Sequence, residues 1–321
     1  MILGTAQLGQ EYGIHNSTGK PSQETAYQIL DYAWNHGIHI LDTAGAYGDA
    51  EDLIGNYQEA TGHTFHICTK LSADVAAGSY GIEANDKMDA DAAGTAERME
   101  RELVKSLRRL RRSQIWLYYL HRFEACKSQA VMQKMEDWKA QGRIKMVGIS
   151  IYEPEELRYI VEHLPDAVDV VQIPFHLLDN IRWLEAGLLQ KAREKGIQIF
   201  ARSIFLQGLF FQEPDSEIAK KLLVQEALSG LHQLAGEYSM HKIQQLAVSF
   251  VAGHPCIDQY LLGCETVEQL MQNIALAERA GKRRLTDVSL EKIADLSRQV
   301  NGDAIDAIDP RKWKERLSCA S

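Results

Sequence analysis

The sequence predicts a closed barrel of eight parallel strands with helices outside it, and three observations lead to that prediction. Short apolar runs alternate with amphipathic stretches almost from end to end of the 321-residue chain. The apolar runs are continuous, which is typical of parallel strands that are buried on both faces. Eight such strand–helix units favour a single (β/α)8 TIM barrel, with extra C-terminal helices and long βα loops over the active site.

The expected elements follow one another in strand–helix order. The strands are the short apolar runs at residues 2–6 (ILGTA), 38–43 (IHILDT), 65–70 (FHICTK), 115–120 (IWLYYL), 145–150 (KMVGIS), 168–174 (VDVVQIP), 197–202 (IQIFAR) and 259–263 (QYLLG). One amphipathic helical stretch follows each of the first seven strands, at residues 23–34, about 49–57, 92–111, 128–141, 154–162, 181–195 and 216–252. A final pair of helices is expected at residues 267–280 and 289–300.

A doubly wound open sheet is the alternative architecture, because it also alternates strands with helices. Such a sheet usually carries a glycine-rich phosphate-binding fingerprint after its first strand, whereas GTAQLGQEYG at residues 4–13 has the wrong spacing. The chain shows no low-complexity linker, composition shift or internal repeat. We therefore expect one domain over residues 1–321.

Composition excludes several classes of partner. A net charge of −9 argues against binding to the phosphate backbone of nucleic acid. Five cysteines without a C-x-x-C pair suit reduced thiols and predict a cytoplasmic protein. The chain has no secretory-type N-terminus and no run that could span a bilayer, so we expect no membrane partner. His63 and His66 have no further ligand nearby in the sequence, so we expect no metal site. Nothing in the sequence indicates the oligomeric state.

A candidate site lies where the predicted strands end, because all βα loops of a barrel meet on that face. The residues at or just after seven of the eight strand ends are Asp42, Lys70, His121, Ser150, Gln172, Arg202 and Gly263. Their concentration at one position relative to the strands predicts a functional site at the carboxyl face of the barrel.

Tyr47, Lys70, Asp42 and His121 form a set with a chemical rationale. A free phenol has a pKa near 10, but a buried ammonium about 4–6 Å away favours the phenolate and lowers the pKa of a phenol. An aspartate keeps such a lysine charged, and a histidine can hold a carbonyl oxygen or share the proton. Taken singly, each has a structural explanation. Asp42 could cap a helix or turn, and Lys70 could be a surface charge at a strand end. Tyr47 could pack its ring at the barrel rim, and His121 could be a half-buried histidine. Together they predict a general acid aimed at a developing alkoxide.

The stretch LDTAGAYGDAEDLIG at residues 41–55 resembles the signature of the aldo-keto reductases, which are (β/α)8 enzymes with nicotinamide cofactors. Further segments match in order: CTKL, LYYLHR, KMVGISIYEPEEL, VVQIPFHLLD, IFARSIFLQGLF and LLGCETVEQLMQNI. The resemblance implies a catalytic tetrad of Asp42, Tyr47, Lys70 and His121, with Tyr47 as proton donor. It also implies NADP(H) or NAD(H) as cofactor and a small carbonyl or alcohol as substrate.

The resemblance implies a set of cofactor contacts as well: Ser150, Gln172, Arg202, Ser203, Leu206, Gly208, Gly263, Glu265, Gln269 and Asn273. Two positions depart from the family pattern. Ile151 stands where an Asn usually follows the serine, and Arg202 stands where many members have an aromatic residue stacked on the nicotinamide. The guanidinium would either stack there, disfavouring the cationic oxidised ring, or bind an anionic group of the substrate.

The T-x-x-Q pattern of Thr266 and Gln269 predicts a capped helix whose N-terminus can bind a phosphate. Where many relatives have Lys or Arg for a 2′-phosphate, this chain has Gly263, Glu265 and Gln269. An acid repels a phosphate but accepts a hydrogen bond from a free ribose hydroxyl, so the choice between NADPH and NADH stays open.

The substrate is expected to meet long loops. Residues 72–93 and 204–215, the latter with Phe210 and Phe211, are long enough to close over the site, and Tyr152 and Trp183 are expected in its wall. A mixed polar and aromatic lining suits a sugar or polyol-like carbonyl. Two other functions fit the same barrel: a regulatory protein that senses bound nucleotide, and Schiff-base chemistry at Lys70.

Overall fold

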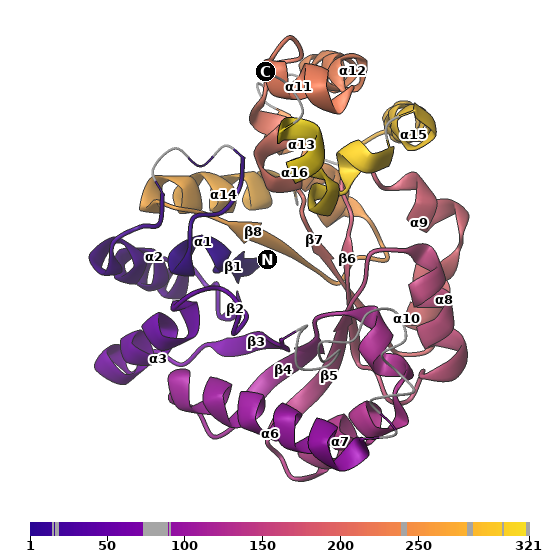
Figure 1. Ribbon diagram of the computed structural model, residues 1–321. Helices are drawn as coiled ribbons and strands as arrows, with labels where there is room; N and C mark the ends of the chain where they lie inside the picture. The colour runs from indigo at the N-terminus through magenta and orange to yellow at the C-terminus, as the bar shows by residue number, and fades with distance from the viewer. Residues whose placement is uncertain are drawn as a thin grey trace.

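A computed structural model confirms the predicted barrel. It describes residues 1–14, 16, 19–72, 89, 91–238, 243–280, 285–303 and 305–318. Eight parallel strands pair in chain order, and the last pairs with the first to close the barrel (Figure 1). They are β1 (Ile2–Gly4), β2 (Ile40–Asp42), β3 (His66–Leu71), β4 (Ile115–Leu120), β5 (Ile144–Ser150), β6 (Val170–Pro174), β7 (Gln198–Arg202) and β8 (Gln259–Gly263).

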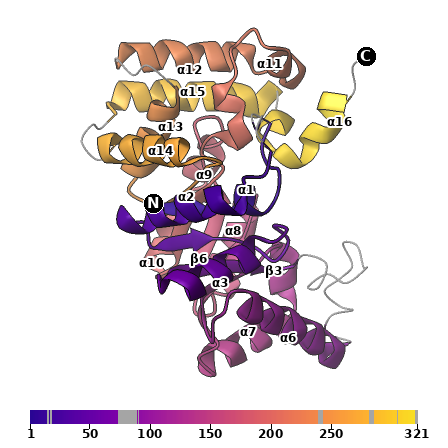
Figure 2. The same cartoon turned by 90° about the vertical axis from the view of Figure 1, so that its left-hand side faces the viewer.

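The helices lie outside the strands. Those of the first six units are α1 (Ala6–Gly9), α2 (Gln23–Asn35), α3 (Ala50–Thr61), α6 (Ala92–Arg109), α7 (Gln129–Ala140), α8 (Pro154–His163), α9 (Ile181–Glu185) and α10 (Leu188–Glu194). Those after β7 are α11 (Glu217–Leu222), α12 (Gln225–Glu237), α13 (Ile243–Gly253), α14 (Val267–Ala280), α15 (Asp287–Asp303) and α16 (Trp313–Ser318). Short 3-10 turns are η1 (Phe123–Lys127), η2 (Leu206–Phe211), η3 (Ile305–Ile308) and η4 (Pro310–Lys312). Figure 2 shows α12 and α15 side by side at one end of the molecule.

Two long predicted helices are broken in the structure. The helix expected at residues 181–195 is two helices, because Gly187 takes a left-handed conformation (φ 62°) between α9 and α10. The helix expected at residues 216–252 is α11, α12 and α13, and Leu223 ends the first of these with φ 59°. Amphipathic periodicity alone did not reveal where these stretches break.

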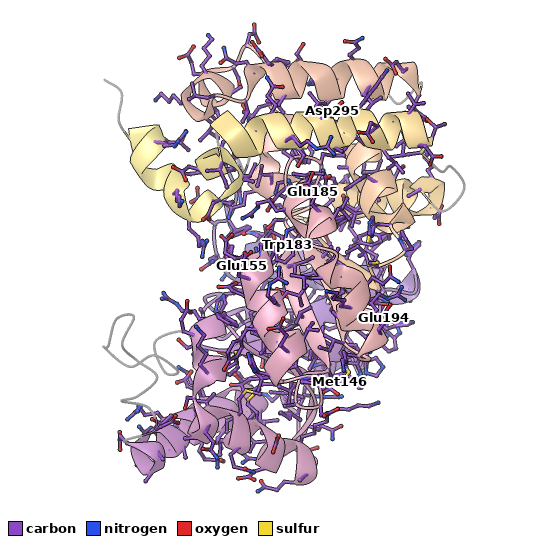
Figure 3. All side chains as sticks on the ribbon, turned by 90° about the vertical axis from the view of Figure 1, so that its right-hand side faces the viewer. Met146, Glu155, Trp183, Glu185, Glu194 and Asp295 are labelled. Atoms are coloured by element: carbon purple, nitrogen blue, oxygen red, sulfur yellow. The ribbon has the colours of Figure 1, made fainter. Side chains whose placement is uncertain are left out.

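The C-terminal helices join the barrel through apolar packing and ion pairs. Arg298 of α15 contacts Glu185 of α9 and Asp295 of its own helix, at 3.2 and 2.7 Å. In Figure 3, Glu185 lies on the part of α9 that faces α15. None of the described helices is long and apolar enough to cross a membrane.

An inner apolar layer fills the barrel beneath its carboxyl face. Its buried members are Ile2, Cys68, Leu117, Tyr119, Val170 and Phe200, and the partly buried Ile40, Met146 and Leu261 pack against them. These side chains come from all eight strands, so the interior is a packed core and not a channel.

Candidate active site

The alternation of side chains along each strand places the predicted site residues inside the barrel. Because side chains two residues apart point to the same face, the residue two positions after each inner-layer residue also points inward. Asp42 follows Ile40, Lys70 follows Cys68, His121 follows Tyr119, Gln172 follows Val170 and Arg202 follows Phe200 in this way. Ser150 and Gly263 have the same parity on β5 and β8. The site is therefore the polar layer directly above the inner apolar layer.

Lys70 and Asp42 form a buried ion pair at the centre of this layer. The Lys70 Nζ lies 2.5 Å from Asp42 Oδ1 and also donates to the Thr43 carbonyl oxygen at 2.8 Å. Gln172 Nε2 donates to the other carboxylate oxygen, Asp42 Oδ2, at 2.9 Å. Burial alone would lower the pKa of Lys70, but Asp42 and Tyr47 outweigh it and raise that pKa above its usual value. Lys70 is thus held in place as an ammonium.

Tyr47 lies beside this ammonium. Its ring centroid is 5.1 Å from Lys70 Nζ, although the two residues come from different loops and strands. The loop that carries Tyr47 packs so closely on α1 that a Cβ at Gly9 would overlap the Tyr47 carbonyl oxygen. Similarly, a Cβ at Gly48, which has φ 56°, would overlap the Gly9 carbonyl oxygen. The two glycines therefore allow the close approach that positions the phenol.

His121 adds a neutral imidazole to the lining of the same cavity. Burial, and then the positive charges of Lys70 and Arg202, lower the pKa of His121 to about 4. It is uncharged at neutral pH. All four members of the predicted tetrad line one cavity of ≈ 800 Å³.

The same cavity extends to β8 and α14 and gathers the predicted cofactor residues. Ser150, Gln172, Arg202, Ser203, Gly208, Gly263, Glu265, Gln269 and Asn273 all line it. Leu206 does not: its side chain is fully buried in the apolar core. The left-handed conformations of Leu206 (φ 46°) and Gln207 (φ 51°) turn the chain so that Gln207 faces the cavity instead.

The far end of the cavity has features that fit a dinucleotide. Gly263 lies directly against the Gln7 side chain, because a Cβ at this position would be 2.5 Å from Gln7 Oε1. The predicted cap of α14 is confirmed, since the Gln269 N–H donates to Thr266 Oγ1 at 3.2 Å. The Gln269 side-chain oxygen in turn accepts from the Glu265 N–H at 2.7 Å. The capped N-terminus of α14, next to Gly263, is a suitable place for a phosphate group.

Loop predictions had mixed outcomes. Tyr152 and Phe211 line the cavity as expected, whereas Trp183 is fully buried in the core, so its prediction as a wall residue was wrong. Figure 3 labels Trp183 on α9. Phe210 is also buried. Most of the segment expected at residues 72–93, namely 73–88 and 90, lies outside the described residues.

Several lining residues were missed by the sequence reasoning. They are Gln7, Tyr12, Asn16, Gln207, Gln244, Gln245, Gln272 and Arg279. Gln7 on α1 and Tyr12 just after that helix both follow the first strand, and the strand-end rule would have pointed to this segment had it been applied there. Burial, with Tyr47 and Tyr152 nearby, raises the pKa of Tyr12 to about 12, so this second phenol stays protonated. The helical residues had no comparable signal, because carboxamides on α13 and α14 look like ordinary surface residues.

Comparisons with known proteins agree with this geometry. The model of the aldo/keto reductase family matches residues 1–297. Aldo-keto reductase str7 of Strobilurus tenacellus is 28% identical over 222 residues, which cover 66% of this chain but only 60% of that protein's length. Protein tas of Escherichia coli (strain K12) is 24% identical over 322 residues, which cover 85% of this chain and 87% of that protein. A solved aldo-keto reductase from Klebsiella pneumoniae in complex with NADPH shares the fold, with a TM-score of 0.61 at 20% identity over 92% of this chain and 90% of that one.

Proposed function

The chain belongs to the aldo/keto reductase family, and from that premise we propose that it interconverts an aldehyde or ketone and an alcohol, with Tyr47 exchanging the proton. The observation that carries this proposal is the 5.1 Å distance between Lys70 Nζ and the centroid of the Tyr47 ring. Family membership gives NADP(H) or NAD(H) as cofactor, which supplies or accepts the hydride when bound.

The chain's own residues would hold that cofactor along the cavity. Ser150 and Gln172 would bind the nicotinamide carboxamide beside the tetrad, as the family pattern implies. Gly263, Glu265 and Asn273 would contact the adenosine end, beside the capped N-terminus of α14. Held in this way, the nicotinamide would lie beside the tetrad and within reach of Tyr47.

In the reductive direction, Tyr47 Oη gives its proton to the carbonyl oxygen as negative charge develops there. The Lys70 ammonium stabilises the phenolate that remains, and its ion pair with Asp42 at 2.5 Å keeps it from moving or losing its charge. In the oxidative direction the same phenolate takes the proton back. The Lys70–Asp42 ion pair already lies beside Tyr47 without substrate, so little reorganisation is required for the proton transfer.

His121 acts as a hydrogen-bonding group in this proposal and not as the acid. With a pKa of about 4, it carries a proton at pH 7 in about one molecule in a thousand. A neutral imidazole can still orient the carbonyl oxygen toward Tyr47. The acid role therefore falls to the phenol.

The other functions considered fit less well. A lysine that forms a Schiff base must be a free amine, but Lys70 is ion-paired and its pKa is raised. A nucleotide sensor would not need a buried ion pair beside a phenol. For the substrate, the carboxamides and phenols of the lining suit a polyol-like carbonyl such as a sugar.

Tyr47→Phe tests the proposal, and Tyr12→Phe is its matched control. Tyr12 is another phenol in the same cavity, so its replacement removes a similar hydroxyl without touching the tetrad. We expect Tyr47→Phe to lower kcat by roughly 100- to 10,000-fold, and Tyr12→Phe by less than about tenfold.

NADPH and NADH are titrated into each variant, with tryptophan fluorescence as the readout. Tyr47→Phe should keep the nucleotide affinity of the wild type, because the lost hydroxyl acts on the substrate. Turnover by Tyr47→Phe within tenfold of wild type would exclude Tyr47 as the proton donor. Nucleotide binding without reduction of any member of a carbonyl panel would favour the sensor.

A further inference from the structure

Arg202 lies in the same polar layer as the tetrad. It ends β7, lines the cavity, and is close enough to His121 to contribute to the lowering of that pKa. Its Nη2 donates to the Ile151 carbonyl oxygen at 3.0 Å, and its Nη1 to Ser203 Oγ at 3.4 Å. A guanidinium has five N–H donors, so these two bonds leave most of its hydrogen-bonding capacity for another partner.

No carboxylate of the described residues forms an ion pair with Arg202, in contrast to the two arginines around it. Arg182 donates to both oxygens of Asp179, at 2.7 and 2.8 Å. Arg311 contacts both oxygens of Asp309, at 2.8 and 2.7 Å. The carboxylates of Asp179 and Asp309 are therefore already paired with other arginines.

The Tyr152 ring fixes the orientation of Arg202. The Arg202 Cζ lies 4.1 Å from the ring centroid, and the Arg311 Cζ lies 3.6 Å from it. Stacking occupies the face of a guanidinium and leaves its N–H groups to partners in its plane. The ring thus holds the charge in place without neutralising it.

The charges of the cavity leave one cation in excess. Among its described lining residues, the cations are Lys70, Arg202 and Arg279, and the anions are Asp42 and Glu265. Lys70 and Asp42 neutralise each other, and Glu265 lies in the loop after β8 and not beside the tetrad. Next to the tetrad, Arg202 is thus a partly buried charge without compensation, which favours a bound anion.

We propose that the carbonyl substrate carries an oxyanion, a carboxylate or a phosphate, that binds Arg202 while its carbonyl oxygen faces Tyr47. The substrate class would then be oxo acids or phosphorylated aldehydes and ketones. This inference rests on the proposed function, because both place the substrate in the same cavity.

Two matched pairs of substrates test the proposal and separate the two oxyanions. One pair is 4-formylbenzoate and its methyl ester; the other is glyceraldehyde 3-phosphate and glyceraldehyde. Wild type should prefer the charged member of at least one pair, and Arg202→Gln should lower that preference in kcat/KM by roughly 10- to 100-fold, mainly through KM. Preference in the first pair alone identifies a carboxylate, and preference in the second alone identifies a phosphate.

Arg311→Gln is the control, because Arg311 also packs on the Tyr152 ring and carries the same charge but does not line this cavity. We expect it to change the preference by less than about threefold. Arg202→Lys is a second variant that keeps the charge and loses the planar fork, and it should retain part of the preference. If Arg202→Gln does not fold, the comparison of Arg202→Lys with wild type decides.

Equilibrium binding distinguishes failure of this inference from failure of the proposed function. NADPH, and separately the product analogue 4-(hydroxymethyl)benzoate, are titrated calorimetrically into wild type and Arg202→Gln. Loss of analogue binding with unchanged NADPH affinity supports the inference even if no carbonyl is turned over. Equal turnover of charged and uncharged substrates, with equal analogue binding by both proteins, would overturn it and leave the reductase function standing. A parallel loss of NADPH affinity would assign Arg202 to the cofactor and also overturn it.

Discussion

Asp42→Asn should destabilise the fold strongly, because it leaves a buried ammonium without its counter-charge. Lys70 is 3% exposed and Asp42 4%. After the substitution, Lys70 Nζ keeps the Thr43 carbonyl oxygen at 2.8 Å but loses the carboxylate at 2.5 Å. Removing one partner of such a buried pair costs about 3–5 kcal/mol of the free energy of unfolding.

The pH dependence of this variant has a defined sign. In wild type the pKa of Lys70 is raised above 10.5, so its contribution is complete below pH 10.5 and is lost only as the pH rises further. In Asp42→Asn, burial without a carboxylate lowers the pKa of Lys70 below 10.5. The unfolded chain then binds the proton more tightly than the folded one, so stability rises with pH toward 10.5.

Urea unfolding at several pH values between 7 and 10 measures both effects. The double variant Asp42→Asn with Lys70→Met removes the stranded charge and should recover at least about 2 kcal/mol relative to Asp42→Asn. A loss below about 1 kcal/mol in Asp42→Asn, with no rise in stability relative to wild type at higher pH, would refute the buried-pair reasoning.

Three further predictions follow from local geometry. Gly9→Ala should unfold at lower urea concentration and lose turnover, because its Cβ would overlap the Tyr47 carbonyl oxygen. Gly236→Ala, in open space on α12, should instead gain about 0.5–1 kcal/mol in the free energy of unfolding. Equal effects of the two substitutions would contradict the packing argument. Burial lowers the pKa of His176 to about 3, so stability should decline as the pH falls from 6.5 toward 3, and melting temperatures of His176→Phe should show a shallower decline than wild type. Glu265→Gln should improve the affinity for NADPH relative to NADH by roughly tenfold, because it removes a negative charge near the adenosine end. A nucleotide titration measures the two affinities, and an unchanged ratio would place Glu265 away from the 2′-phosphate.

The positions of Asp42, Lys70 and His121 could be predicted because two simple periodicities determine them. Parallel strands bring their carboxyl ends to one face, and the two-residue alternation decides that Asp42 and Lys70 point inward. Neither depends on tertiary detail. The strand-end rule also identified Ser150 and Arg202, which end β5 and β7, and Gln172, which lies near the end of β6.

Some residues that sequence reasoning missed or misplaced depend on backbone conformations that have no reliable signal in the chain. Leu206 and Gln207 both adopt left-handed angles that non-glycine residues rarely take, and it is Gln207, for which no prediction was made, that lines the cavity in place of Leu206. The break at Gly187 was equally hidden, because amphipathic periodicity alone did not reveal it. Trp183 was placed in the wall from its chemistry alone, whereas burial decided its position.

The pairing of β1 with β8 has a consequence for how the chain folds. Ile2 lies in register with Leu261, so the last seam of the sheet joins its first strand to its last. During synthesis β1 and β7 must therefore wait with unpaired edges until residues near 260 leave the ribosome, and non-local closure of this kind is slow. Aggregation of nascent chains should be most severe in that interval, and a chaperone that shields strand edges would reduce it.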